Sequence, residues 1–141
     1  VLDPDPEAVH ASLYEDPPEF DGVDRHASFT MEFPGGVQAQ CSSSYGVYGT
    51  NTFEIIGTEG RIRFEPIFNV DDDRRITILR DRGETVVEAQ EPPEMVEEFD
   101  YFATCLLTDR EIGPDGEHGH FDVRVTEAIQ ESAETGERVE L

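Results

Sequence analysis

The sequence predicts an α+β domain: a largely antiparallel β-sheet with helices packed on one face and the other face open for an oligomer or domain contact. Residues 9–88 hold segments in which apolar and polar residues alternate, as in half-buried strands. A helical period replaces the alternation after residue 94, and one short strand closes the chain. Strands and helices segregated in this way are typical of α+β folds, in which helices cover one side of an antiparallel sheet.

The first predicted strand covers residues 9–14, and the clearest alternation follows it. In residues 27–33 and 37–45 most odd-numbered positions are apolar, and the even-numbered positions are polar. Pro34-Gly35-Gly36 separates the two segments and is a turn signal, so they are predicted to form a β-hairpin. The even-numbered positions would give the sheet a broad polar surface with these members: Ser28, Thr30, Glu32, Gln38, Gln40, Ser42 and Ser44.

Four shorter strands are predicted as two further hairpins. They cover residues 53–56, 61–65, 75–79 and 84–88, and glycine-containing turns join each pair.

Two helices follow. The first is predicted from an apolar stripe with helical spacing: Met95, Phe99, Phe102 and Leu106. The second carries apolar and small residues on one face between residues 121 and 133, and Gly136 occupies the position just beyond its end. The segment Gly113–Gly119 is predicted to be a flexible loop that leads into this helix. Residues 138–141 are predicted to form the closing strand.

The charge of the chain excludes several function classes. The sequence has 33 Asp and Glu against 10 basic residues, which gives a formal net charge of −23. Nucleic acids and anionic membranes would repel such a surface. All ten basic residues are Arg, and Lys is absent. An acidic surface without Lys predicts a cytoplasmic protein of an organism that accumulates molar salt, because salt screens the repulsion between carboxylates.

The motifs that carry chemistry are few. The sequence contains no Gly-x-Gly-x-x-Gly, so a dinucleotide fingerprint is missing, and without Lys there is no Walker A or Schiff-base lysine. His118 and His120 stand among acidic residues, but a two-residue spacing in a loop is a weak metal signal, and no metal is expected. One of these histidines could instead point into a cleft shared with another domain. Cys41 and Cys105 are predicted to be small buried apolar residues.

Two surfaces remain open to more than one interpretation. Tyr45 and Tyr48 flank Gly46 at the end of the longest predicted strand, where they could form a ligand-facing lip or pack at the edge of the sheet. The polar sheet face could be solvated, or it could pack against another sheet or domain.

Three segments resemble the C-terminal domain of the Gfo/Idh/MocA oxidoreductases, the family of glucose-fructose oxidoreductase and inositol dehydrogenase. Phe53–Phe64 is similar to its central pair of strands, with Ile-x-Gly-x-x-Gly between them. Glu94–Phe102 looks like its Glu-rich helix with a spaced pair of Phe residues, and Glu127–Leu141 resembles its closing Ala-Ile-x-x-Ser-Ala-x-x-Gly-x-x-Val-x-Leu. The acidic, Lys-free composition looks like that of haloarchaeal members, among them sugar dehydrogenases.

The resemblance implies that residues 1–141 are the substrate-side and oligomerisation domain of an NAD(P)-dependent sugar or polyol dehydrogenase. The family carries a Rossmann domain and a catalytic Glu-Lys-Pro lysine upstream. NAD or NADP would therefore be bound in the full-length parent and not by this chain alone. Only the parent would be an enzyme, and no catalytic residue, cofactor-binding residue or metal ligand is assigned here. The chain begins with Val1, and we expect it to be a fragment or a processed chain.

The resemblance also implies two groups of site residues. Substrate contacts are expected at Tyr45, Tyr48 and Thr50, to which His118 is added as the residue that could face a shared cleft. A homo-oligomer interface is expected at Gln38, Gln40, Ser42 and Ser44. The alternative is a stand-alone dimerisation or binding module without enzymatic activity, and a third hypothesis is a metal-dependent activity at His118 and His120.

Overall fold

The computed structural model describes residues 5–68, 74–89 and 93–141. Two antiparallel sheets and two α-helices are present, which confirms the predicted α+β class. The chain divides into two compact units. The first comprises the chain up to Val47 together with Gly113–Leu141, and the second comprises Tyr48–Ile112. The predicted strands are therefore split between two four-stranded sheets, a division that the alternation pattern did not reveal.

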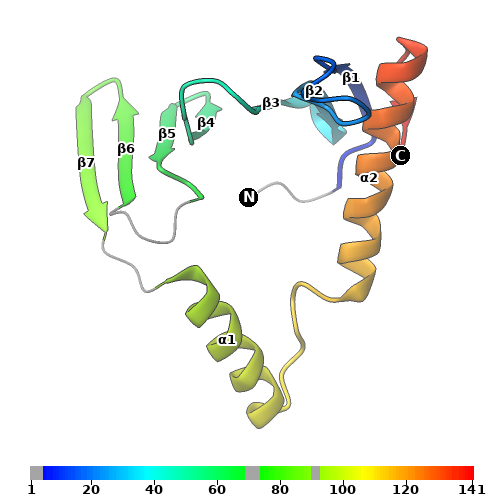
Figure 1. Ribbon diagram of the computed structural model, residues 1–141. Coiled ribbons are helices and arrows are strands. Elements are labelled where there is room, and N and C mark those ends of the chain that lie inside the picture. Colours follow the sequence, from blue (N-terminus) through cyan, green and yellow to red (C-terminus); the bar gives the residue numbers. More distant parts are fainter. Residues whose placement is uncertain (1–4, 69–73, 90–92) are drawn as a thin grey trace. The chain divides into compact units, whose positions relative to one another are not determined.

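The first unit is a sheet with the strand order β3-β2-β1-β8 and one helix against it. Its strands are β1 (Ala8–Tyr14), β2 (His26–Phe33), β3 (Val37–Ser44) and β8 (Val139–Glu140). A 3-10 turn, η1 (Pro34–Gly36), joins β2 to β3 and confirms the predicted hairpin. Figure 1 shows helix α2 (Gly116–Thr135) running alongside β1.

Helix α2 packs against β1 and β8 on one side of this sheet and forms the core of the unit with β1. Val9 and Ala11 are 0% and 5% exposed, and Ala128 and Ser132 of α2 are buried as well. The Ser132 hydroxyl accepts a hydrogen bond from the Ala11 N–H at 3.0 Å and donates one to the Glu137 carbonyl at 2.5 Å. Since side chains alternate along a strand, His10, which lies between Val9 and Ala11, points to the opposite face.

The ends of α2 are set by two local signals. Gly136 has a φ of 72°, so the helix ends at the glycine that the sequence predicted. The predicted loop over Gly113–Gly119 is wrong from Gly116 onward, because the helix already begins there. The Asp115 carboxylate accepts a hydrogen bond from the His118 N–H at 2.9 Å, and this cap allows the two glycines to be helical.

The second unit holds the other sheet, in which each strand pairs with the next along the chain. The strands are β4 (Phe53–Gly57), β5 (Gly60–Glu65), β6 (Arg74–Arg80) and β7 (Gly83–Ala89). Both predicted hairpins are confirmed, and β5 also pairs with β6.

Helix α1 (Glu94–Thr108) follows the second sheet and carries the predicted apolar stripe. The stripe lies in solvent, with Met95, Phe99, Phe102 and Leu106 between 49% and 67% exposed. Cys105 is buried, as predicted, whereas Cys41 of β3 is half-buried. Neither of the two described helices combines the length and the apolar composition needed to cross a bilayer.

Candidate functional site

The first candidate site is a shallow concavity of about 540 Å³ on the first sheet. Six of its lining side chains belong to alternate strand positions, and we call them the polar face: His10, Ser12, Ser28, Thr30, Gln40 and Ser42. They occupy the face of the sheet opposite to α2, because Val9 and Ala11 point toward the helix.

The register of the strands explains why these side chains meet. His10 lies opposite Thr30, and Thr30 lies opposite Gln40, so the three form a row across the sheet. Ser12, Ser28 and Ser42 form the neighbouring row in the same way. Hydroxyl, amide and imidazole groups both donate and accept hydrogen bonds, so the polar face can bind a polar, uncharged surface or ligand.

The predicted interface residues lie on this face. Gln40 and Ser42 line the concavity, while Gln38 and Ser44 stand near the ends of β3 with the same orientation along the strand. His10 and Ser12 were not among the residues predicted for this face. A signal was available, because they alternate with Val9, Ala11 and Leu13 as the polar residues of the next strand do.

Charged groups stand at the border of the polar face. The Arg138 guanidinium donates from Nε to Glu32 at 2.9 Å and from Nη1 to Glu140 at 3.4 Å. These bonds raise the pKa of Arg138 above its ordinary value, and the bond to Glu32 has the largest effect. Burial raises the pKa of the Cys41 thiol, so it stays protonated at neutral pH.

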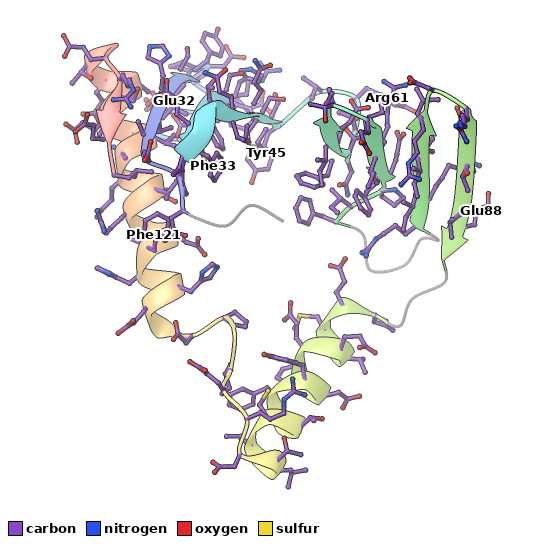
Figure 2. The ribbon with its side chains drawn as sticks, turned by 180° about the vertical axis from the view of Figure 1, so that it is seen from behind. Glu32, Phe33, Tyr45, Arg61, Glu88 and Phe121 are labelled. Atoms are coloured by element: carbon purple, nitrogen blue, oxygen red, sulfur yellow. The ribbon has the colours of Figure 1, made fainter. Side chains whose placement is uncertain are left out.

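The second candidate site surrounds Tyr45, just beyond β3 (Figure 2). The Tyr45 ring stacks on Phe20, with the ring centroids 6.4 Å apart and 22° between the planes. Arg25 lies over the Phe20 ring, 5.5 Å from the guanidinium carbon to the centroid, and forms an ion pair with Asp16. Of these four residues, only Tyr45 was predicted as a site residue. Phe20 and Arg25 lie in the loop between β1 and β2, where no periodic pattern marks them.

The other predicted substrate contacts are exposed. Tyr48 is 95% exposed and, like Thr50, lies on the segment that leads into β4 in the second unit. The next residue, Asn51, was not singled out. Its side-chain oxygen accepts hydrogen bonds from the N–H groups of Ile67 and Phe68 at 3.2 and 3.0 Å, and its amide donates to the Phe68 carbonyl. Asn51 therefore ties this segment to residues 67–68, just beyond β5.

His118 and His120 lie in the first turns of α2 and not in a loop. His118 is exposed, and its Nε2 is 3.8 Å from the Asp122 carboxylate. Within residues 5–68, 74–89 and 93–141, no group of three or more His, Cys, Asp or Glu side chains is arranged to hold a metal ion.

Residues 113–119 do not have the arrangement that binds a dinucleotide. The glycines nearest to a phosphate-binding pattern, Gly116 and Gly119, follow helix α1 and a loop, whereas that pattern requires a strand before it. The carboxylate of Asp115 already binds the N-terminus of α2, where a pyrophosphate would have to lie.

Comparison with known proteins gives concordant results. Residues 1–63 match the family model described as the GFO/IDH/MocA C-terminal domain. The whole chain aligns with D-xylose 1-dehydrogenase [NADP(+)] of Haloarcula marismortui, at 38% identity over 142 residues and 39% of that protein's length. D-xylose 1-dehydrogenase (NADP(+)) 2 of Haloferax volcanii is 34% identical over 123 residues, which cover 85% of this chain and 38% of the relative. The chain thus spans about two fifths of these relatives.

Solved structures agree with the sequence comparison. The aldose-aldose oxidoreductase of Caulobacter crescentus, complexed with glycerol, matches 97% of this chain and 42% of its own with a TM-score of 0.88 and 29% identity. Levoglucosan dehydrogenase in complex with NADH matches with a TM-score of 0.77 at 22% identity, which covers 96% of this chain and 44% of that one and supports the fold. The chain therefore belongs to the GFO/IDH/MocA family of oxidoreductases and corresponds to their C-terminal domain.

Proposed function

We propose that this chain is the substrate-side and assembly domain of an NADP-dependent dehydrogenase that oxidises an aldose of the D-xylose type. The observation that carries the proposal is the 38% identity to the Haloarcula marismortui D-xylose 1-dehydrogenase along the whole chain. The net charge of −23 without Lys supports a cytoplasmic protein that works in molar salt.

Residues 1–141 contain no Lys. We propose that the cofactor and the catalytic lysine belong to an upstream Rossmann domain, as the family resemblance implies. That domain is also the proposed partner of the exposed apolar stripe on α1. We also propose that Tyr45 contacts the sugar, and Tyr48, Thr50 and His118 stay predicted sugar contacts.

The polar face is proposed to join two copies of the chain. Its neutral donors and acceptors are unusual in so acidic a protein, and they allow two identical surfaces to approach without carboxylate repulsion. A two-fold interface of this kind is self-complementary, so each Gln40 could pair with a residue of the second copy.

The test is an assay of the full-length protein, purified from the complete gene in 2–3 M KCl. We expect D-xylose or a close aldose to reduce NADP⁺, followed at 340 nm, with a smaller rate for NAD⁺ and none for polyols. Absence of any aldose oxidation with both cofactors contradicts the proposal.

Residues 1–141 alone provide the control. We expect no NADP⁺ binding by calorimetry and no oxidation of D-xylose. Micromolar binding of NADP⁺ would show that the cofactor site has been assigned to the wrong part of the protein.

A further inference from the structure

Arg25 holds together a loop and a strand end that the sequence keeps apart. Its side chain forms the ion pair with Asp16, lies over the Phe20 ring and reaches the Tyr45 carbonyl, 3.5 Å from Nε. Its backbone also binds on both sides, since its N–H donates to the Tyr14 carbonyl and its carbonyl accepts from the Tyr45 N–H. One residue thus fixes the position of residues 16–20 relative to the end of β3.

Gly46 makes room for this arrangement. A Cβ at this position would lie 3.2 Å from Nη2 of Arg25, and the φ of 74° disfavours any other residue. The guanidinium therefore packs directly on the turn that follows Tyr45, which fixes the backbone at the base of the Tyr45 ring.

The result is a pair of neighbouring aromatic rings on a loop that also carries exposed acidic residues. The Phe20 and Tyr45 rings are nearly parallel, Phe20 is half-buried, and Tyr45 is 67% exposed. The Asp16 carboxylate balances the positive charge of Arg25. Paired rings of this kind offer apolar faces to C–H groups, and the phenol of Tyr45 adds a hydrogen-bond donor and acceptor.

We propose that Phe20 and Tyr45 form a stacking surface for the apolar face of the sugar, and that Arg25 is the positioning residue that holds both rings. The inference rests on the proposed aldose oxidation and adds Phe20, Arg25 and Asp16 to it. A neutral sugar is the fitting occupant, because its ring carries C–H groups on one side and hydroxyls around its edge. Small-molecule sites commonly combine aromatic walls with a few polar groups.

The test compares variants of the full-length protein by steady-state kinetics. We expect Phe20→Leu to raise the KM for D-xylose about three- to tenfold, the range expected for a lost aromatic contact, with kcat within about twofold. The KM for NADP⁺ should stay unchanged. Arg25→Met should also raise the KM for D-xylose. Arg25→Lys keeps the positive charge near Asp16, so its KM for D-xylose should lie between those of Arg25→Met and the wild type.

Helix α2 offers a matched control. Arg124 lies over the Phe121 ring, 5.8 Å from its centroid, in the same kind of pair but away from Tyr45 in sequence and fold. Arg124→Met should leave both KM values unchanged. An unchanged xylose KM in Phe20→Leu, in an active enzyme, overturns the proposal.

Hydrogen exchange separates this inference from the proposed function. We expect 100 mM D-xylose to slow exchange in peptides covering residues 15–25 and 44–46 of the full-length protein, and Arg25→Met to speed it without sugar. Protection by xylose without any aldose oxidation would refute the proposed function alone. Oxidation of xylose with neither protection nor a KM effect would refute the stacking surface alone.

Discussion

At the scale of single residues, Ser132 shows how one hydroxyl fastens a helix to a strand. It is fully buried, accepts from the Ala11 N–H and donates to the Glu137 carbonyl. Both partners are backbone groups that no side-chain change can remove. Loss of the hydroxyl would therefore leave the buried Ala11 N–H without this partner.

Ser132→Ala should lower the free energy of unfolding of the first unit by about 1–3 kcal/mol, the cost of an unsatisfied buried donor. The measurement is hydrogen exchange of β1 amides together with the thermal midpoint in 2 M KCl. Ser43→Ala, at an exposed position of β3 outside the polar face, is the control and should change neither quantity. Equal behaviour of the two variants would contradict the role of the buried hydroxyl.

Gly60 is required by a close backbone approach. Its φ is 153°, and a Cβ there would overlap the Leu79 carbonyl oxygen of the neighbouring strand β6. Gly60→Ala should therefore destabilise the second sheet by at least about 2 kcal/mol. Gly57→Ala is the matched control in the same turn, since its nearest contact would be an ordinary 3.8 Å from the Gly60 carbonyl oxygen. Circular-dichroism melts of both variants give the comparison.

At the scale of elements, the start of α2 depends on Asp115. The carboxylate satisfies the N–H of His118, and two glycines in the first turns make the helix weak without that cap. This cap also accounts for the difference between the predicted loop and the observed helix. Glycines signal a loop by propensity, but a cap and the packing of α2 on β1 outweigh that propensity.

Asp115→Ala should cost about 0.5–2 kcal/mol of local stability and speed exchange of the amides at residues 117–119. Asp115→Asn keeps an oxygen that can cap the helix, so it should stay close to the wild type. Hydrogen exchange resolved by fragment mass would detect the difference. A loss of protection in the Asn variant equal to that in the Ala variant would argue against capping.

At the scale of the whole molecule, the net charge and the polar face have opposite effects on the association of two copies. A net charge of −23 repels a second copy, whereas the neutral polar face permits contact. Salt decides the balance, because the Debye length falls from about 10 Å at 0.1 M to about 3 Å at 1 M. Folding of the single chain should depend on salt for the same reason.

Raising KCl from 0.1 to 2 M should increase the thermal midpoint of the full-length protein, because screening lowers the repulsion among carboxylates. The measurement is a series of melts at constant pH. Sucrose at matched osmolality is the control for effects other than screening. A midpoint independent of salt would contradict the proposed adaptation to molar salt.

Ser42→Arg should convert the proposed oligomer to a smaller species, because a large charged side chain on the polar face prevents close approach. Ser43→Arg is the matched control, since Ser43 is the next residue of β3, is also exposed, and points to the other face of the strand. Light scattering in 2 M KCl compares the masses. Equal masses for the two variants would place the interface elsewhere.

Local sequence patterns predicted the strands of the first sheet and the faces that the side chains of β2 and β3 occupy. Alternation placed Gln40 and Ser42 on one face with Thr30, and the turn glycines fixed the hairpin register that brings these residues together. Local information suffices here, because strand period and turn geometry are properties of neighbouring residues.

Contacts between segments that lie far apart in the chain could not be predicted from the sequence and became visible only in the folded structure. The division of the strands into two sheets, the addition of His10 and Ser12 to the polar face, and the Arg25 cluster all depend on contacts between separate segments. Phe20 lies in an irregular loop, whose position is set by an ion pair and a ring contact and not by any repeating pattern. Periodicity predicts which face a side chain occupies, but only packing decides which other segment meets it there.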